Sequence, residues 1–342
     1  MQHLLFISRK THGTGGMQRL NADLWKGFQQ FSNVRAQRIC PYCRGDLTFA
    51  FRACRAALTL RGKDARVHLG DAALCPLGVL LKLLSGCKVS VTACGLDLTY
   101  PRAWYQRLMR WSLPQMDHVV CISRATAIDA RKRGVVDEHL SIIPCGIWPD
   151  DHQISTRRDH QKPRLITVGR LIPRKGVVWF LSEVFPILLK AHPAIEYTII
   201  GSGPDAEHIQ RVIIKNCYQK QVKLIQDATD QDLRSALAEA TIFVMPNIPI
   251  QNDPEGFGIV CIEASAVGVP VAASRLEGIQ DAVIDQKTGC FFQPNDASSC
   301  VRCIEKMLAR TWDRNLVRSE TLKHFAWPAL LSSYHHDVFH FS

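Results

Sequence analysis

Two glutamates in a glycine-rich setting are the strongest chemical signal in the sequence. Glu255 and Glu263 lie in the run DPEGFGIVCIEASAVGVPVAAS, which predicts a loop entering a helix that carries Glu263. Free N–H groups of such a loop and helix start can bind a diphosphate or sugar hydroxyls, and a carboxylate one or two turns into the helix can accept hydrogen bonds from a ribose. The candidate residues of this segment are Glu255, Gly256, Phe257, Gly258, Ile259, Val260 and Glu263.

Two cations follow another predicted strand. Gly169, Arg170 and Lys175 lie in VGRLIPRKG, just past the carboxyl end of the strand, where open α/β sheets bind ligands. Two cations there suit a diphosphate. A departing nucleoside diphosphate gains negative charge, and fixed cations stabilise that charge without a metal. A solvated basic turn is the alternative interpretation.

A third candidate site is the glycine-rich loop after the first predicted strand. Gly13, Gly15 and Gly16 precede a helix expected to begin near Met17, and such a loop lets the backbone approach a phosphate. The spacing does not match GxGxxG, and the Lys-Ser/Thr pair of a P-loop is missing. A turn whose glycines serve only tight packing is the alternative.

The elements that must position these residues alternate between short apolar runs and longer amphipathic stretches. This alternation predicts parallel α/β architecture, with two doubly wound, Rossmann-like domains facing a central cleft. The predicted strands are HLLFIS, KVSVTA and HVVCIS in the first series and RLITVG, EYTIIG, VKLIQ, TIFVMP and VPVAAS in the second. The helices expected in the first series span residues 17–31, 103–113 and 125–133.

The length of 342 residues also favours two domains. We expect an acceptor-side domain over residues 1–150, a polar linker over 151–163 and a nucleotide-sugar-binding domain over 164–325. The aromatic tail, 326–342, is expected to form a helix that crosses back to the first domain.

Taken together, these segments make the chain resemble the family 4 retaining glycosyltransferases of GT-B fold. Among them, it resembles the mannosyltransferase-like enzymes that act on lipid acceptors. The resemblance covers nearly the whole chain through GTGGMQRL, GLDLTYP, VVCISRAT, SIIPCGI, TVGRLIPRKGV, IIGSGP, the MPN run and EGFGIVCIEASAVGVPV. It implies a hexose donor, GDP-mannose or a UDP-sugar, that is a substrate, and no cofactor or metal.

The resemblance also implies roles for individual residues. Glu255 would face the donor sugar and Glu263 its ribose, Arg170 and Lys175 would bind the diphosphate, and Gly16 would close over it. Retention of configuration by front-face attack, in which the leaving phosphate deprotonates the acceptor hydroxyl, is likewise implied by the resemblance.

Two positions depart from the family pattern. Cys94, three residues before Asp97 on the expected acceptor and sugar side, stands where the family has a histidine, and Cys145 stands where it often has asparagine. A thiol is a weak hydrogen-bond partner. A degenerate protein that binds nucleotide sugars without catalysis therefore stays open, as does a sugar-nucleotide epimerase.

The positive charge is confined to the first half of the chain. Residues 1–150 hold 21 Lys+Arg and 10 Asp+Glu, which accounts for the whole net charge of +11. An anionic partner is expected: a membrane surface, an anionic acceptor or nucleic acid. No nucleic-acid module appears, which favours a lipid-linked or saccharide acceptor in surface polysaccharide or glycolipid synthesis. Residues 102–110, RAWYQRLMR, either lie on an anionic membrane or form a domain helix with its aromatic face in the core.

The remaining signals are weaker. Thirteen scattered cysteines indicate reduced thiols, and MQHLLFIS is typical of a buried first strand rather than a signal peptide. These features predict a cytoplasmic protein, peripheral at the cytoplasmic face of the inner membrane. Cys40 and Cys43 form a CxxC pair without the context of a redox or zinc site. Asp230 and Asp232 resemble a DxD metal motif, but helix capping explains them more simply.

Overall fold

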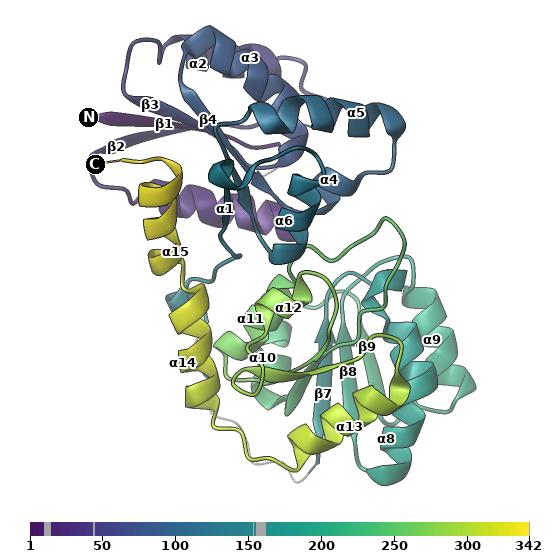
Figure 1. Ribbon diagram of the computed structural model, residues 1–342. Coiled ribbons are helices and arrows are strands. Elements are labelled where there is room, and N and C mark those ends of the chain that lie inside the picture. Colours follow the sequence, from purple (N-terminus) through teal and green to yellow (C-terminus); the bar gives the residue numbers. More distant parts are fainter. Residues whose placement is uncertain (10–14, 44, 153, 155–161, 342) are drawn as a thin grey trace. The chain divides into compact units, whose positions relative to one another are not determined.

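The computed structural model describes residues 1–9, 15–43, 45–152, 154 and 162–341. The chain forms two compact units, one of residues 1–146 with 327–342 and one of residues 147–326 (Figure 1). Most of the expected linker lies outside the described residues, namely 153 and 155–161. Within the described part, no helix has the length and apolar character needed to cross a membrane.

The first unit is built on a parallel six-stranded sheet in the order β2-β1-β3-β4-β5-β6. Its inner strands are mostly buried on both faces, as parallel strands covered by helices must be, although β3 carries Arg66 and His68. The chain order reverses between β1 and β3, and loops at the carboxyl ends of such strands form a crevice. The strands are β1 Gln2–Ile7, β2 Val34–Ile39, β3 Ala65–Leu69, β4 Lys88–Ala93, β5 His118–Cys121 and β6 Leu140–Ile142.

Helices cover both faces of this sheet. Figure 1 shows α2, α3 and α5 along one face and α1 and α6 along the other. The α-helices are α1 Gly16–Phe28, α2 Phe49–Leu58, α3 Cys75–Ser85, α4 Leu96–Thr99, α5 Ala103–Ser112, α6 Arg124–Arg131 and α15 Trp327–Ser333. Short turns of helix are η1 Ala72–Leu74, η2 Leu113–Gln115, η3 Asp137–His139 and η7 Tyr334–Val338.

The C-terminal segment is part of the core of the first unit. The Tyr334 hydroxyl lies 3.2 Å from Thr92 Oγ1 on β4, and Arg66 Nε on β3 donates to the Phe339 carbonyl at 2.8 Å. The Phe28 ring on α1 lies 5.4 Å from the Phe339 ring. Because aromatic side chains bury large apolar areas, the last fifteen or so residues contribute substantially to the packing of the first unit.

The second unit is a parallel six-stranded sheet in the order β12-β11-β10-β7-β8-β9. Its chain order reverses between β7 and β10. The strands are β7 Arg164–Val168, β8 Glu196–Ile200, β9 Val222–Ile225, β10 Ile242–Met245, β11 Val271–Ser274 and β12 Gly289–Phe292. The helical elements are η4 Pro149–Asp151, η5 Pro173–Lys175, α7 Val177–Trp179, η6 Phe180–Val184, α8 Phe185–Ala191, α9 Ala206–Lys215, α10 Asp230–Glu239, α11 Ile259–Ala266, α12 Ile279–Ala282, α13 Ala297–Leu308 and α14 Arg314–Phe325.

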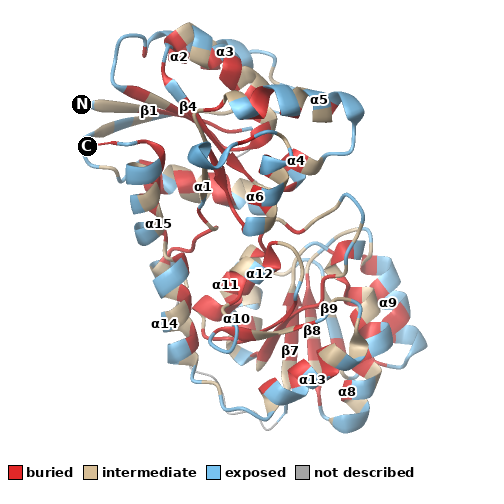
Figure 2. Cartoon of the chain, viewed as in Figure 1, coloured by how far each residue is buried: buried red, intermediate tan, exposed pale blue. Residues whose placement is uncertain are grey.

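The prediction of two doubly wound, Rossmann-like units is confirmed by these two sheets. Figure 2 shows the buried residues concentrated in the strands and in the helix faces turned toward them. All eight predicted strands are present as β1, β4, β5, β7, β8, β9, β10 and β11, and the predicted helices correspond to α1, α5 and α6. Strands β2, β3, β6 and β12 were not predicted. The N-terminal part of the first unit ends at Gly146, four residues before the expected limit, and residues 147–150 belong to the second unit.

Candidate functional site

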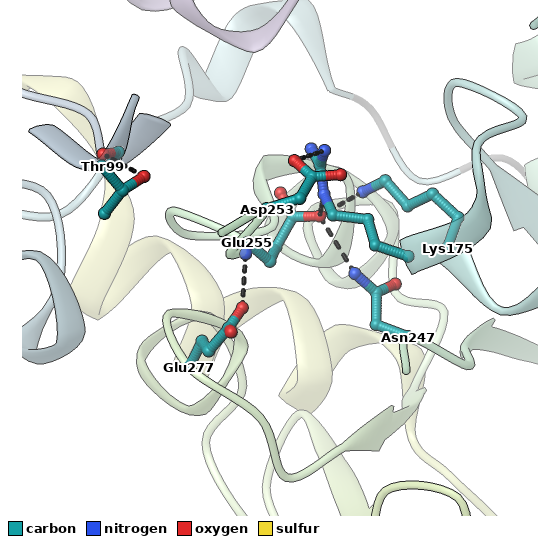
Figure 3. A network of polar contacts seen from close by, with 8 residues as sticks. Thr99, Lys175, Asn247, Asp253, Glu255 and Glu277 are labelled. Carbon is teal, nitrogen blue, oxygen red and sulfur yellow. Dashed lines mark hydrogen bonds and ion pairs between the residues drawn. The ribbon is translucent and has the colours of Figure 1, made fainter. Parts of the chain in front are cut away.

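The switch point of the second sheet brings together five polar side chains. The loop after β7 contributes Arg174 and Lys175, and the segment between β10 and α11 contributes Asn247, Asp253 and Glu255. Because the carboxyl ends of β7 and β10 are adjacent in the sheet, residues about 80 positions apart in sequence come into contact. Figure 3 shows Lys175 and Asn247 pointing toward Glu255 from two sides.

Glu255 is the centre of this cluster. Its Oε2 accepts hydrogen bonds from Lys175 Nζ at 2.6 Å and from Asn247 Nδ2 at 3.0 Å, and Arg174 Nε lies 3.4 Å away. The residue is only 9% exposed. Burial by itself would raise the pKa of Glu255, but the charges of Lys175 and Arg174 outweigh burial and lower the pKa to about 2. Glu255 is therefore an anion at neutral pH and can accept hydrogen bonds but cannot donate a proton.

Arg174 links this carboxylate to a second one. Its Nη1 donates to Asp253 Oδ1 at 2.8 Å while its Nε faces Glu255. Gly176 ends the short helix that holds both cations, with φ +65°. A Cβ added there would lie 1.9 Å from the Pro246 carbonyl oxygen. Only glycine therefore allows the loop after β7 to approach the loop after β10 this closely.

A turn after β11 holds the backbone of Glu255 from the other side. The Glu277 carboxylate accepts a hydrogen bond from the Glu255 N–H (Figure 3), and the Gly278 N–H donates to the Glu255 carbonyl at 3.1 Å. Glu277 has φ +44°, an unfavourable conformation for a residue with a Cβ. Burial, followed by the neighbouring Glu255 charge, raises the pKa of Glu277. The strained turn thus fixes the position of Glu255.

The glycine-rich segment forms the start of α11. Gly258 is the N-cap with φ +85°, and Ile259 and Val260 are the first two helical residues. Phe257 is buried, with its ring 6.0 Å from the Phe325 ring, which anchors the loop. Glu263 lies one turn into the helix and is half-buried. The Cys261 N–H donates to the Gly258 carbonyl at 2.9 Å, so the candidate donors to a phosphate are the N–H groups of Ile259 and Val260, the first two of the helix.

Arg170 differs from Lys175 in its surroundings. Its side chain is exposed and forms no ion pair with any residue that the structure describes. The neighbouring Gly169 has φ +152°, and a Cβ on Gly201 would lie 1.9 Å from the Gly169 carbonyl oxygen. The loops after β7 and β8 are therefore in close contact, with Arg170 projecting from them. Of the two predicted cations, Lys175 is engaged with Glu255 and Arg170 is open to a ligand.

The residues that the sequence alone did not single out are Arg174, Asn247, Asp253 and Glu277. Arg174 adjoins Lys175 in PRKG and Asn247 belongs to the MPN run, so position in a motif was the available signal for both. Glu277 had no signal, because its role depends on a backbone contact with residue 255 and on a left-handed φ.

In the first unit, Gly15 is the N-cap of α1 and Gly16 is its first residue, while Gly13 lies outside the described residues. A Cβ added to Gly16 would meet no described atom within 4 Å. Tight packing against the described part of the chain therefore does not explain glycine at position 16.

Asp97 and Cys94 lie at the carboxyl end of β4. The buried Asp97 carboxylate accepts hydrogen bonds from the N–H groups of Cys94 at 2.9 Å and Ala72 at 2.8 Å. Burial, followed by the charge of Asp71, raises the pKa of Asp97 to about 6. Burial and the Asp97 charge raise the pKa of the Cys94 thiol well above its usual value, so the thiol is neutral. Asp71 in turn pairs with Arg9 at 2.8 Å.

The structure also describes the residues of the two weaker motifs, the DxD-like pair and the CxxC pair. Thr229 is the N-cap of α10 and forms a capping box with Asp232, which confirms the capping interpretation of the DxD-like pair. Cys40 and Cys43 are free thiols. No group of three or more His, Cys, Asp or Glu side chains among the described residues is arranged to hold a metal ion.

Comparisons with known proteins bear on the family and the fold of this chain. Residues 13–151 match the family model described as Glycosyltransferase Family 4, and residues 150–322 match the model described as Glycosyl transferases group 1. Anabaena HepE, solved in complex with UDP, superposes with a TM-score of 0.78 over 98% of this chain and 99% of that one, at 14% identity. At that identity the likeness shows the fold.

Two relatives are similar in sequence. The GPI3 subunit of phosphatidylinositol N-acetylglucosaminyltransferase from Saccharomyces cerevisiae is 24% identical over 243 residues, 69% of this chain and 49% of that protein. The GDP-mannose-dependent alpha-(1-6)-phosphatidylinositol monomannoside mannosyltransferase of Mycolicibacterium smegmatis is 33% identical over 150 residues, 43% of this chain and 39% of that protein. The chain thus spans about half, or less, of the length of these two proteins.

Proposed function

This chain belongs to the group 1 and family 4 glycosyltransferases, and from that membership we propose that it transfers a hexose from a nucleoside-diphosphate sugar to a lipid-linked or saccharide acceptor. The observation that supports the proposal most directly is the ionised Glu255, held by Lys175 and Asn247 at the switch point of the second sheet. An anionic acceptor of hydrogen bonds at that place suits the hydroxyls of a donor sugar.

The surrounding residues suit the rest of the donor. Arg170 is exposed beside the site, and the N–H groups of Ile259 and Val260 begin α11. A diphosphate bound there would be stabilised as its bond to the sugar breaks and negative charge develops. Glu263, one turn into the same helix, would accept hydrogen bonds from the ribose hydroxyls.

The proposed chemistry is the front-face attack that the family resemblance implies, and it requires no proton from Glu255. A carboxyl group with a pKa of about 2 is not a general acid at neutral pH. The anomeric carbon would exchange its bond to the diphosphate oxygen for a bond to the acceptor oxygen on the same face. The acceptor proton would then pass to the leaving diphosphate, which gives retention without an enzymic proton donor.

The acceptor is proposed to be anionic and membrane-associated. The first half of the chain holds the whole net charge of +11, and both relatives act, by their names, on phosphatidylinositol compounds. A lipid-linked acceptor in glycolipid or surface polysaccharide synthesis fits both observations, with peripheral contact to an anionic membrane. GDP-mannose and UDP-sugars are the donors to test first.

Thermal unfolding in the presence of nucleotides tests the donor site. A ligand present at about 100 times its dissociation constant adds about 2.7 kcal/mol to the free energy of unfolding, so the correct one among UDP, GDP, ADP and their sugar conjugates should raise Tm. Glu263→Ala and Arg170→Ala should abolish that rise. Arg211→Ala, which removes an exposed arginine of α9, is the matched control and should retain it. No response to any nucleotide from folded protein would contradict the proposal.

A protein that binds the donor without transferring the sugar is the second candidate. The observation that favours it is the neutral thiol of Cys94, directly after β4. The family that the chain resembles has a histidine at this position, and histidine can ionise near neutral pH. Cys94→His tests it. If the wild-type protein binds a nucleotide sugar but transfers nothing, and Cys94→His gains transfer, the second candidate replaces the first.

A further inference from the structure

Three neighbouring helices of the first unit each carry exposed apolar side chains on their outer faces. Helix α2 packs beside α3, and α3 packs beside α5, so the three outer faces adjoin (Figure 1). The exposed fractions are 78% for Leu83, 70% for Phe51 and 62% for Trp104. We call this surface the three-helix face; its apolar residues are Phe51 and Leu58 on α2, Leu80 and Leu83 on α3, and Trp104 and Trp111 on α5.

The spacing of these residues shows that they form outward stripes, not loosely packed core. On α2, Phe51 and Leu58 are two turns apart, while Ala53 and Ala57 face the core. Arg55 lies between the two exposed residues and is itself exposed.

Helix α5 repeats this arrangement. Trp104 and Trp111 are two turns apart with the exposed Arg107 between them, whereas Tyr105 and Met109 are buried in the core. The expectation of a domain helix with its aromatic face in the core therefore describes Tyr105 only. Both tryptophans are exposed, as the arginines of this helix are.

The three helices of this face carry charge of one sign. Between residues 47 and 116 the only acidic residues are Asp64, Asp71 and Asp97, against ten lysines and arginines, and none of the three lies on α2, α3 or α5. Asp71 and Asp97 are buried, which leaves Asp64 as the one exposed carboxylate of this stretch. Two cations of these helices are compensated from outside this stretch, Arg52 by Asp46 at 2.6 Å and Lys82 by Asp117 at 2.8 Å. The exposed Arg55, Arg107 and Arg110, which lie beside the exposed apolar side chains, form no ion pair with any described residue.

Exposed tryptophan, leucine and phenylalanine beside arginine match the headgroup region of an anionic bilayer. Tryptophan favours the membrane interface, the long arginine side chain reaches the lipid phosphates from there, and the apolar groups enter the acyl boundary. A contiguous exposed apolar surface on a protein is typically an interaction site. The absence of carboxylates on the three helices favours a lipid surface over a protein partner of mixed charge.

We propose that the three-helix face docks on the surface of an anionic lipid bilayer, with Trp104 and Trp111 at the interface and Arg107 and Arg110 on lipid phosphates. This inference rests on the proposed function, because a membrane-associated acceptor is the reason for the enzyme to be there. Docking would hold the first unit at the surface where such an acceptor lies.

Vesicle binding by the full chain tests the proposal. Vesicles of phosphatidylcholine and phosphatidylglycerol should bind the protein, vesicles of phosphatidylcholine alone should bind it much less, and added salt should weaken binding. The double variant Trp104→Ala/Trp111→Ala should lower the partition coefficient at least tenfold and remove the blue shift of tryptophan fluorescence on binding. On anionic vesicles, the double variant Arg107→Gln/Arg110→Gln should lower the partition coefficient by about fivefold for each arginine removed.

The second unit supplies matched controls. Leu316 on α14 is 63% exposed and Leu83 on α3 is 78% exposed. Leu83→Ser should weaken vesicle binding, whereas Leu316→Ser should not. Arg302→Gln, at an exposed position of α13, is the control for the arginine pair. All substituted side chains are at least half exposed or lie on the surface, so circular dichroism should show every variant folded.

Each outcome decides the proposal. Equal vesicle binding by the wild-type chain and by both double variants would overturn it, as would wild-type protein that ignores anionic vesicles. Self-association that is lost in the Trp104→Ala/Trp111→Ala variant would mean that a second copy of the chain covers the face, and would also overturn it. Transfer activity on a detergent-solubilised acceptor, measured in parallel, distinguishes this failure from a failure of the proposed function, because transfer without vesicle binding refutes only the docking.

Discussion

Replacing Lys175 by methionine should destabilise the second unit in a way that depends on pH. The substitution removes the ammonium group 2.6 Å from Glu255 Oε2 and leaves the carboxylate 9% exposed with Arg174 at 3.4 Å. The native interactions lower the pKa of Glu255 from 4.5 to about 2, which corresponds to about 3 kcal/mol of stability at neutral pH. Loss of one partner of a buried ion pair costs a similar amount, about 3–5 kcal/mol.

The direction of the pH dependence follows from the lowered pKa. Because the folded protein holds the Glu255 carboxylate more tightly ionised than the unfolded chain does, this stability is fully present above pH 4.5 and is lost as the pH falls toward about 2. In Lys175→Met the pKa of Glu255 should rise, so the free energy of unfolding of the variant should fall less on acidification than that of the wild type. The difference in free energy of unfolding between wild type and variant should therefore be largest at pH 7 and shrink below pH 4.5.

Urea denaturation at pH 7 and at pH 3.5 measures both differences. The double variant Lys175→Met/Glu255→Gln, in which neither charge is left, should recover part of the stability lost in the single variant, and the double-mutant cycle gives the coupling between the two residues. A difference below about 0.5 kcal/mol at pH 7 would refute the ion pair as a determinant of stability, since that is the range of ordinary surface substitutions. An equal loss at both pH values would refute the electrostatic explanation.

Three further predictions concern the backbone and the tail. Glu277→Ala should lower the rate of transfer more than Glu277→Gly, because both variants lose the acceptor for the Glu255 N–H but only alanine keeps the unfavourable φ of +44°. Steady-state kinetics of the two variants tests this, and equal rates would contradict it. Gly176→Ala should unfold the second unit or lower its Tm strongly, because the added Cβ would lie 1.9 Å from a carbonyl oxygen. Gly16→Ala should fold as the wild type does, because its Cβ meets no described atom within 4 Å. An unchanged Tm for Gly176→Ala would contradict the close approach of the two loops. Deletion of residues 327–342 should abolish cooperative unfolding of the first unit, since this segment supplies Tyr334 and other aromatic core residues; a retained transition by calorimetry would show that the tail is dispensable.

The strands that escaped prediction show where sequence patterns lose information. Strands β2, β6 and β12 lie at sheet edges, where exposed polar residues such as Arg35 and Gln37 on β2 dilute the apolar signal. Strand β3 is central but carries Arg66 and His68. Their polar groups are satisfied by contacts distant in sequence: Arg66 donates to the Phe339 carbonyl, and the His68 ring bonds Ser90 and Thr92.

Local sequence patterns were enough to predict the class of architecture, the division into two units and the segments of the candidate site. These features depend on local patterns: apolar runs that must be buried, glycines that permit close approach or a left-handed φ, and a glutamate run that enters a helix. Family resemblance pointed to Glu255, Glu263, Arg170 and Lys175 for the same reason, since each lies in a contiguous motif.

Which charged side chains pair with one another could be seen only in the folded protein. Three cations, Arg170, Arg174 and Lys175, lie within six residues, and nothing in their spacing indicates that Arg174 and Lys175 bind Glu255 while Arg170 stays exposed. The choice depends on how the loops after β7 and β10 pack where the strand order reverses, and on the turn at Glu277 that fixes the Glu255 backbone. Ion pairing and burial are properties of distances between segments far apart in the chain, and those distances exist only in the folded protein.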